Sequence, residues 1–271
     1  MKKTLTVILA LTLCLGLLAG CGKASDPTVL KVGASTTPHA EILAQVKDTL
    51  AKEGYDLQIV EFSDYVLPNT ALEDGDLIAN YFQHTPYLNS FNAEHGTHLV
   101  SVASIHYEPF GIYAGKAASI DALTDGAKIA VPNDGSNETR ALLLLQQEGI
   151  LTLKEGIDAS SNATKLDIAE NPLNIEIVEM EAAQLVSSLP DVELAVINGN
   201  YALLGGLNAS SDALAIENAD GDAAQTYANI IAVKEGSEKD PGVLALVKAL
   251  QSDAVRDYIN ATYGGAVVPI F

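Results

Sequence analysis

Short apolar runs alternate along most of the chain with segments in which apolar residues recur at helical spacing. Strands are predicted at 29–34, 57–62, 77–82, 99–105, 128–131, 175–179, 194–198 and 230–233. Helices are predicted at 38–52, from residue 85 onward, and at 137–148, 182–189, 243–250 and 252–263. Strands that alternate with helices indicate an α/β fold with parallel sheets covered on both faces. The pattern extends over roughly 240 residues, more than one average domain, so we expect two lobes.

The N-terminal segment has a different pattern. Lys2 and Lys3 precede a mostly apolar stretch, 4–18, which is shorter than the roughly 20 residues that a membrane-spanning helix needs. A basic start and a short apolar run are typical of a secretory signal peptide. The stretch ends in Leu18-Ala19-Gly20-Cys21, which matches the bacterial lipobox.

We therefore predict that residues 1–20 are removed and that Cys21 carries a diacylglycerol and further acyl chains such as palmitate. Residues 21–28 would then form a short tether between the lipid and the folded part. The alternative is an ordinary signal peptide with a chance cysteine. The lipobox interpretation predicts a location on the extracytoplasmic face of the cell membrane, through the lipid anchor.

Composition and charge narrow the classes of function. The formal net charge is −20, and loss of Lys2 and Lys3 with a signal peptide would make it more negative. Phosphate backbones repel so acidic a surface, which argues against nucleic acid as a partner. Both cysteines, Cys14 and Cys21, precede the predicted folded part. That part therefore has no disulfide, no cysteine-ligated zinc and no cysteine nucleophile.

No enzyme signature survives inspection. The segment from Gly111 to Ala117 resembles a phosphate-binding loop, but three residues instead of four separate its glycines, and Ala117 stands where Ser or Thr would hold magnesium. Neither a G-x-S-x-G nor a G-x-G-x-x-G sequence occurs. We predict that the protein is not an enzyme, has no catalytic residues and uses no cofactor.

Four histidines raise the question of a metal site. His84, His95, His98 and His106 lie close together in the sequence, and imidazole is a common zinc ligand. Gly96, however, lies where a helix would end, so His95 and His98 are not expected to share a helical face. We interpret the four as surface or capping residues and predict no metal site.

Aromatic and polar residues gather around the strand that ends near residue 82. Tyr65, Phe82 and Tyr87 lie beside the polar residue His84. Ligands of open parallel sheets bind at the carboxyl ends of strands, where such turns meet. Aromatic rings could wall an apolar slot and contact a thioether sulfur. Plain core packing is the alternative explanation of the same residues.

The segment 130–146 combines a strand, a polar loop and a helix start. Ser136 and Asn137 are good N-cap residues, and free N–H groups at such a start attract an anion. Arg140, in the first turn, has a guanidinium that can bind a carboxylate through two hydrogen bonds. A solvated or salt-bridged arginine is the alternative.

Two asparagines lie at the ends of apolar strands: Asn198 follows one strand and Asn229 precedes another. Their amide oxygens could accept hydrogen bonds from an ammonium group. Asparagine is also a common turn residue, and this second interpretation stays open.

Taken together, these segments resemble the NlpA family of lipoproteins, which includes methionine-binding proteins of ABC importers. The resemblance covers nearly the whole chain. Its motifs are Asp64-Tyr-Val-Leu-Pro-Asn69, Phe82-Gln-His-Thr-Pro-Tyr-Leu88, Val131-Pro-Asn-Asp134, Asn137 with Arg140-Ala-Leu, Glu170-Asn-Pro172 and Ala195-Val-Ile-Asn198. One departure is Ile78, which stands where many members have Asp.

The resemblance implies a two-lobed fold like that of type II periplasmic binding proteins, with ligand enclosed between the lobes. The expected lobes are 29–109 plus 231–271, and 110–230. The implied roles are a side-chain pocket of Tyr65, Phe82, His84 and Tyr87, a carboxylate contact at Arg140, and contacts of Asn198 and Asn229 with the amino and carboxylate ends.

The resemblance also implies capture of L- or D-methionine, or of a methionine-containing dipeptide, for an ABC permease and ATPase. Another small amino acid or a metal ion is the alternative ligand.

Overall fold

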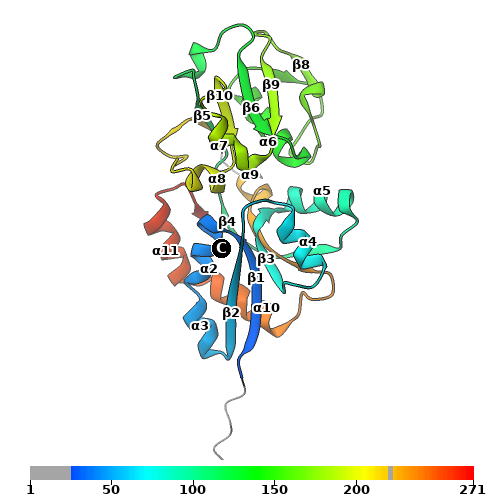
Figure 1. Ribbon diagram of the computed structural model, residues 1–271, viewed down its shortest axis with the longest axis vertical. Helices are drawn as coiled ribbons and strands as arrows, with labels where there is room; N and C mark the ends of the chain where they lie inside the picture. Colours follow the sequence, from blue (N-terminus) through cyan, green and yellow to red (C-terminus); the bar gives the residue numbers. More distant parts are fainter. Residues whose placement is uncertain (1–25, 219–221) are drawn as a thin grey trace, which may run out of the picture.

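The structure, a computed structural model, describes residues 26–218 and 222–271. The predicted signal peptide, the lipobox and Cys21 lie outside the described residues. The chain folds into two α/β lobes, one above the other in Figure 1, with α8 (Gly199–Leu204) and α9 (Asp222–Thr226) near their junction. The predicted two-lobed α/β fold is confirmed. Among the described residues, no helix is long and apolar enough to cross a membrane.

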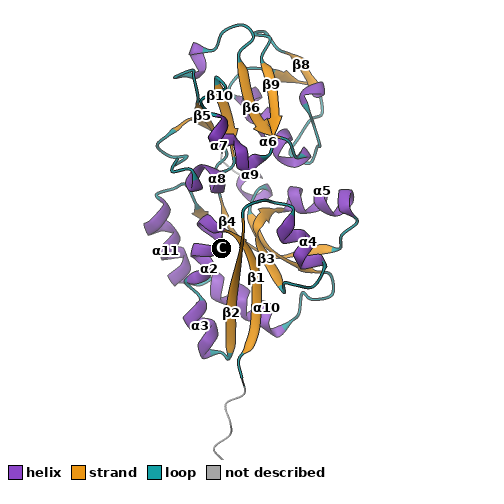
Figure 2. Cartoon of the chain, in the orientation of Figure 1, coloured by secondary structure: helices purple, strands orange, loops and turns teal. Residues whose placement is uncertain are grey.

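The lower lobe is built on a six-stranded sheet with the order β13-β4-β12-β3-β1-β2. Its strands are β1 (Thr28–Ser35), β2 (Tyr55–Phe62), β3 (Ala79–His84), β4 (Leu99–Tyr107), β12 (Asn229–Lys234) and β13 (Val268–Pro269). The helical segments are η1 (Thr36–Ala40), α2 (Glu41–Ala44), α3 (Lys47–Lys52), α4 (Leu67–Glu73), α5 (Thr85–His95), α10 (Pro241–Leu250) and α11 (Asp253–Tyr263). Helices flank the strands on both sides (Figure 2).

The upper lobe is built on a five-stranded sheet with the order β11-β5-β10-β6-β9. Its strands are β5 (Gly111–Ala114), β6 (Lys128–Pro132), β9 (Glu176–Met180), β10 (Leu194–Ile197) and β11 (Ala213–Ile216), beside a small pair, β7 (Thr152–Leu153) and β8 (Ile168–Glu170). Helices α6 (Gly135–Gln147) and α7 (Leu185–Ser188) and the short turns η2 (Ile120–Ala122), η3 (Lys165–Asp167) and η4 (Ala182–Gln184) complete it.

The chain passes between the sheets twice. It leaves the lower sheet at the end of β4, enters the upper sheet at β5, and returns after β11 to β12. Since β12 pairs with β3 from Asn229 onward, we propose that the second lobe boundary lies just before Asn229. The strands next to the two passages run antiparallel to their neighbours, β12 to β3 and β4, and β5 to β10. The sheets are therefore mixed and not purely parallel as predicted, because a strand that enters from the other lobe starts at the opposite end of the sheet.

Three helix predictions differ from the structure in detail, and the one at 182–189 is divided into η4 and α7. The predicted helix at 38–52 is divided into η1, α2 and α3, with a turn at Gln45 and Val46. Helix α6 begins at Gly135, and its N-cap is Asp134 instead of Ser136 or Asn137. The Asp134 carboxylate accepts the backbone N–H of Asn137 at 2.9 Å, which satisfies a donor that the first helical turn leaves free.

Each lobe has its own core. In the lower lobe, buried Leu30, Val32 and Ile231 of the sheet pack with Leu246 of α10 and Ile259 of α11. In the upper lobe, one face of the sheet packs against α6 and the other against α7 and α8. Separate cores let the lobes act as stiff bodies that meet across the two passages.

Gly115, at the end of β5, provides a test of the upper lobe. A Cβ atom at this position would lie 2.6 Å from the carbonyl oxygen of Leu189 and closer still to that of Val192. Neither backbone atom can rotate away, so we expect Gly115→Ala to lower the free energy of unfolding by about 1–3 kcal/mol. The matched control, Ala114→Ser on the exposed neighbour, should change it by less than about 0.5 kcal/mol. Urea unfolding measures both, and equal stability of the two variants would contradict the close approach.

Candidate functional site

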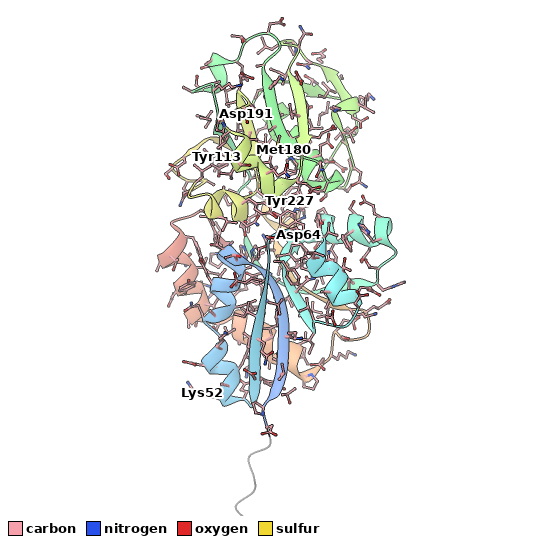
Figure 3. All side chains as sticks on the ribbon, viewed as in Figure 1. Lys52, Asp64, Tyr113, Met180, Asp191 and Tyr227 are labelled. Atoms are coloured by element: carbon pink, nitrogen blue, oxygen red, sulfur yellow. The ribbon has the colours of Figure 1, made fainter. Side chains whose placement is uncertain are left out.

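A cavity lies between the lobes. All seven residues predicted for the ligand site line it: Tyr65, Phe82, His84, Tyr87, Arg140, Asn198 and Asn229. Gln83, Glu108, Asn137, Gly199 and Asn200 complete the lining. Figure 3 shows Tyr227, which packs over Arg140, and Asp64, the neighbour of Tyr65, at the level where the lobes meet. The structure therefore gathers the predicted residues in one place, while their roles in binding stay a prediction.

Strand ends bring these residues together. Phe82 and His84 end β3, Asn198 directly follows β10, and Arg140 lies in α6, which follows β6. The carboxyl ends of β3 in the lower lobe and of β6 and β10 in the upper lobe face the junction, so side chains from both lobes reach the same space. Asn229 enters from the first position of β12, where the returning strand starts at that edge.

Asn137 joins the two sides of the cavity. Its Nδ2 donates to both carboxylate oxygens of Asp134 at 2.9 Å, so its Oδ1 is the acceptor. That oxygen receives Nδ2 of Asn198 at 2.9 Å and Nε2 of His84, from the lower lobe, at 3.1 Å. Nδ1 of His84 accepts the backbone N–H of Tyr87 and caps α5, which leaves the proton on Nε2.

These contacts fix the polarity of Asn198. Because its Nδ2 is bound to Asn137, its buried Oδ1 faces the cavity as an acceptor and has no partner among the described residues. A buried acceptor without a hydrogen bond is unfavourable by about 1–3 kcal/mol, so a donor from a ligand would relieve it.

Asn229 has the opposite polarity. Its Oδ1 lies 2.9 Å from Nε2 of His39, and the same nitrogen lies 3.4 Å from Oε1 of Glu108. A nitrogen between two oxygen acceptors carries its proton, so Oδ1 of Asn229 is the acceptor. The Nδ2 group of Asn229, which has no hydrogen bond within the described residues, remains available as a donor.

Arg140 is buried in a clamp of its own chain. Its Nε donates to Oε2 of Glu217 at 2.9 Å, and its Nη2 donates to Oε1 of Glu217 and to the carbonyl oxygen of Glu108. The guanidinium also lies over the rings of Tyr227, at 4.1 Å, and Phe110, at 4.8 Å. Burial alone would lower the pKa of Arg140, but the charge of Glu217 raises it, so the side chain stays positive.

The pair with Glu217 changes what Arg140 can offer a ligand. The fork formed by Nε and Nη2 faces Glu217, so it is not free to grip a ligand carboxylate through two bonds as expected from the sequence. Arg140 is therefore salt-bridged, as the alternative interpretation of the sequence proposed, and it also lines the cavity. Nη1, which makes no hydrogen bond within the described residues, is the nitrogen left for a ligand.

An aromatic wall closes the other end of the cavity. The ring centroid of Tyr65 lies 5.8 Å from that of Phe82 and 5.6 Å from that of Tyr87. The hydroxyl of Tyr65 donates to Oδ1 of Asn200 in the upper lobe at 2.6 Å, and the hydroxyl of Tyr87 donates to the carbonyl oxygen of Tyr65 at 3.0 Å. These bonds satisfy the polar tips, so the rings present apolar surface to the cavity.

A second buried cluster lies behind Asn229. Nε2 of His106 and Nε2 of His39 lie 2.7 and 3.4 Å from Oε1 of Glu108, and Nδ1 of His106 is bound to the hydroxyl of Tyr81. The three potential ligand atoms lie within 4.8 Å of one another, the spacing of a metal site. The 2.7 Å separation between His106 and Glu108 is that of a direct hydrogen bond.

Comparisons with known proteins place the chain in a family. The NlpA lipoprotein family model matches residues 30–271. The chain belongs to the NlpA lipoprotein family.

Similar proteins of the family are known from sequence and from structure. The chain is similar to a putative lipoprotein from Ruminococcus gnavus, with 58% identity and a TM-score of 0.88 over 90% of this chain and 100% of that one. A nutrient-binding protein from Burkholderia cenocepacia, solved bound to methionine, has 46% identity and a TM-score of 0.84 over 89% and 100%. The D-methionine-binding lipoprotein MetQ of Salmonella typhi is 43% identical over 256 residues, 93% of this chain and 92% of that protein.

In this NlpA lipoprotein, the prediction that four histidines are surface or capping residues is correct for three of them. His95 and His98 are exposed and His84 caps α5, as expected. His106 is fully buried, so its interpretation as a surface or capping residue was wrong. His39, Glu108 and Glu217 were missed, because each acquires its role from partners that no sequence motif links to it. The sequence offered one signal for Glu108: this acid lies shortly after a predicted apolar strand.

Burial sets the charge of these groups. It lowers the pKa of His84 to about 3, helped by the charge of Arg140, and lowers the pKa of His39 to about 4 and of His106 to about 3. All three histidines are therefore neutral at pH 7. Burial raises the pKa of the Glu108 and Asp134 carboxyls in the same environment.

The neutral state of His84 can be tested through stability. A histidine whose pKa is lowered by folding takes up its proton only in the unfolded chain, so it destabilises the fold as pH drops below about 6.5. Asparagine can still cap α5, so His84→Asn removes the titration and keeps the cap. Between pH 7 and pH 5 we expect the wild type to lose about 2 kcal/mol more unfolding free energy than this variant. Urea unfolding at both values measures the difference, and parallel losses would show that His84 titrates normally.

Proposed function

We propose that this chain is an extracytoplasmic substrate-binding lipoprotein that captures methionine and delivers it to an ABC transporter. The observation that carries the proposal is the cavity between the lobes, which has hydrogen-bonding groups of both polarities at one end and apolar rings at the other. A free amino acid with an unbranched apolar side chain likewise has charged groups at one end and apolar atoms at the other. The role is binding and not catalysis.

Each end of the ligand's zwitterion has a partner of suitable polarity. Oδ1 of Asn198 accepts from the ammonium group, since its amide nitrogen is already bound. Nδ2 of Asn229 donates to the carboxylate, since the amide oxygen accepts from His39. Nη1 of Arg140 adds a positive partner for the carboxylate.

The aromatic wall selects the side chain. Thioether sulfur makes favourable contacts with aromatic rings, and an unbranched chain fits a slot between flat surfaces. Tyr65, Phe82 and Tyr87 supply these surfaces. His84 closes the slot in its neutral form, so it adds no charge beside an apolar side chain.

The relatives agree with this assignment. The Burkholderia protein is described as bound to methionine, and the Salmonella protein is named for D-methionine. They support methionine as the ligand class, whether L-methionine, D-methionine or a methionine-containing dipeptide. Another small amino acid or a metal ion is the less favoured ligand.

Location and partners follow from the family and the N-terminus. We infer that residues 1–20 are a signal peptide and that acylated Cys21 holds the lobes at the outer face of the cell membrane. The partners are then an ABC permease and its ATPase.

The proposal predicts a ligand that stabilises the protein. Purified protein should release methionine on denaturation, identified by mass spectrometry. After unfolding, dialysis and refolding, added methionine should raise the melting temperature, because a ligand that binds only the folded state stabilises it by mass action. Aspartate, which has a charged side chain, is the control and should give no shift. A protein that no amino acid or methionine dipeptide stabilises would contradict the proposal.

A substitution in the aromatic wall tests the side-chain slot. Phe82→Ala removes a ring from the cavity and should weaken methionine binding by about tenfold or more, since loss of a buried aromatic contact exceeds about 1.4 kcal/mol. Phe91→Ala is the matched control: Phe91 has the same 4% exposure and belongs to the same cluster, but it does not line the cavity. Calorimetry measures both affinities. Equal losses in the two variants would mean that Phe82 acts only through packing.

A further inference from the structure

Glu108 is a buried acid that the sequence did not assign to the site. It follows β4, where the chain first leaves the lower sheet, and its side chain lines the cavity with only 6% of its surface exposed. Gly199 lets α8 come close to it, because a Cβ atom at position 199 would lie 2.6 Å from the Cβ of Glu108. The fold therefore holds this carboxyl group against the ligand space.

The groups bound to Glu108 carry no positive charge. Oε1 receives Nε2 of His106 at 2.7 Å and faces Nε2 of His39 at 3.4 Å. A hydrogen bond from the backbone N–H of Asn200 adds a third neutral donor. Both imidazoles are neutral at pH 7, so neither gives Glu108 a positive partner, and burial raises the pKa of its carboxyl group.

The nearest cation is engaged elsewhere. Arg140 binds the carboxylate of Glu217 through Nε and Nη2, and what it touches of Glu108 is the backbone carbonyl. The pair of Arg140 and Glu217 has no net charge. The charge of Arg140 acts on Glu108 only from a distance, and none of the described residues places a cation in direct contact with this carboxylate. A buried charge without a bonded partner of opposite sign is strongly unfavourable.

We propose that Glu108 is the counter-charge of the ligand's ammonium group and that it makes a free amine a requirement for binding. The inference rests on the function proposed above and deepens it. When the ligand binds, its ammonium group forms an ion pair with the carboxylate of Glu108. Oδ1 of Asn198, the cavity acceptor without a partner, takes a second N–H of the same group.

The competing explanation is structural. Glu108 could serve only to join His39, His106 and the start of α8, with no contact to the ligand. The two explanations differ in one respect: a counter-charge acts on ligands that have an amine and leaves amine-free ligands unaffected, whereas a purely structural role changes the binding of both alike.

The experiment compares two ligands on two proteins. The ligands are methionine and 4-(methylthio)butanoic acid, which has the same side chain and carboxylate but no amine. Binding is measured by calorimetry on wild-type protein and on Glu108→Gln, which keeps the shape and the hydrogen bonds of the side chain but not its charge. In the wild type, methionine should bind at least ~30-fold more tightly than the acid, which corresponds to the loss of one partner of a buried charge pair. In Glu108→Gln that preference should fall by about tenfold or more, with the affinity for the acid retained.

Two further variants sharpen the test. Glu138→Gln removes an equally buried acid that lies outside the cavity, and it should keep the methionine affinity within about twofold. Glu108→Asp keeps the charge and withdraws it by one methylene, so it should retain part of the preference for the amine. It also keeps the question open to measurement if Glu108→Gln does not fold.

The outcomes separate the two proposals. Wild-type protein that binds neither ligand refutes the proposed function. Methionine binding with the same preference for the amine in wild type and Glu108→Gln, or a wild-type preference below about tenfold, refutes the role of Glu108 and leaves methionine capture standing.

Discussion

The site depends on one amide oxygen, Oδ1 of Asn137, which accepts hydrogen bonds from both sides of the cavity. Because Asp134 holds the amide nitrogen of Asn137, the oxygen has a single orientation. It then fixes the proton of His84 in the lower lobe and the amide of Asn198 in the upper lobe. A contact that requires both lobes is made only when they are close together. The hydrogen bond between Asn137 and His84 therefore joins the two lobes and also orients the groups that face the ligand.

Charge in the cavity follows a consistent arrangement. Three buried histidines are neutral, the positive charge of Arg140 is matched by Glu217, and Glu108 is left with neutral donors. A site with this arrangement favours a ligand that brings its own cation. It also disfavours a ligand with a second negative charge, since Glu108 would face it across a poorly solvated space.

The aromatic wall belongs to the same closed arrangement. Tyr65 contacts Phe82 and Tyr87 within the lower lobe and Tyr201 in the upper lobe, with its ring 5.0 Å from that of Tyr201. Its hydroxyl bonds to Asn200 across the junction. Opening the lobes would break these contacts together with those of Asn137, so exposure of the ligand and loss of the recognition geometry occur in one step. That coupling suits a protein that must hold a small molecule and then release it to a transporter.

The sequence by itself determined the α/β pattern and the division into two lobes, while the roles of the cavity residues came from the family resemblance. The spacing of apolar residues that marks helices and strands is a local property of the sequence. In open parallel sheets the carboxyl ends of strands gather at one edge, so residues at predicted strand ends are expected to lie near one another. The residues singled out in the sequence, among them Phe82, His84 and Arg140, line one cavity. The sequence could not say which groups these residues would bond to.

Only the tertiary structure decided the partners and therefore the polarity of each group. Arg140 meets Glu217 77 residues away, and His39 meets Asn229 at a separation of 190. Helix α6 starts earlier than its best-looking cap residues because Asp134 reaches the free N–H groups first. Burial then neutralises the histidines and isolates Glu108. Such effects depend on distances between residues and on exclusion of water in the folded chain, and the local sequence does not determine either of them.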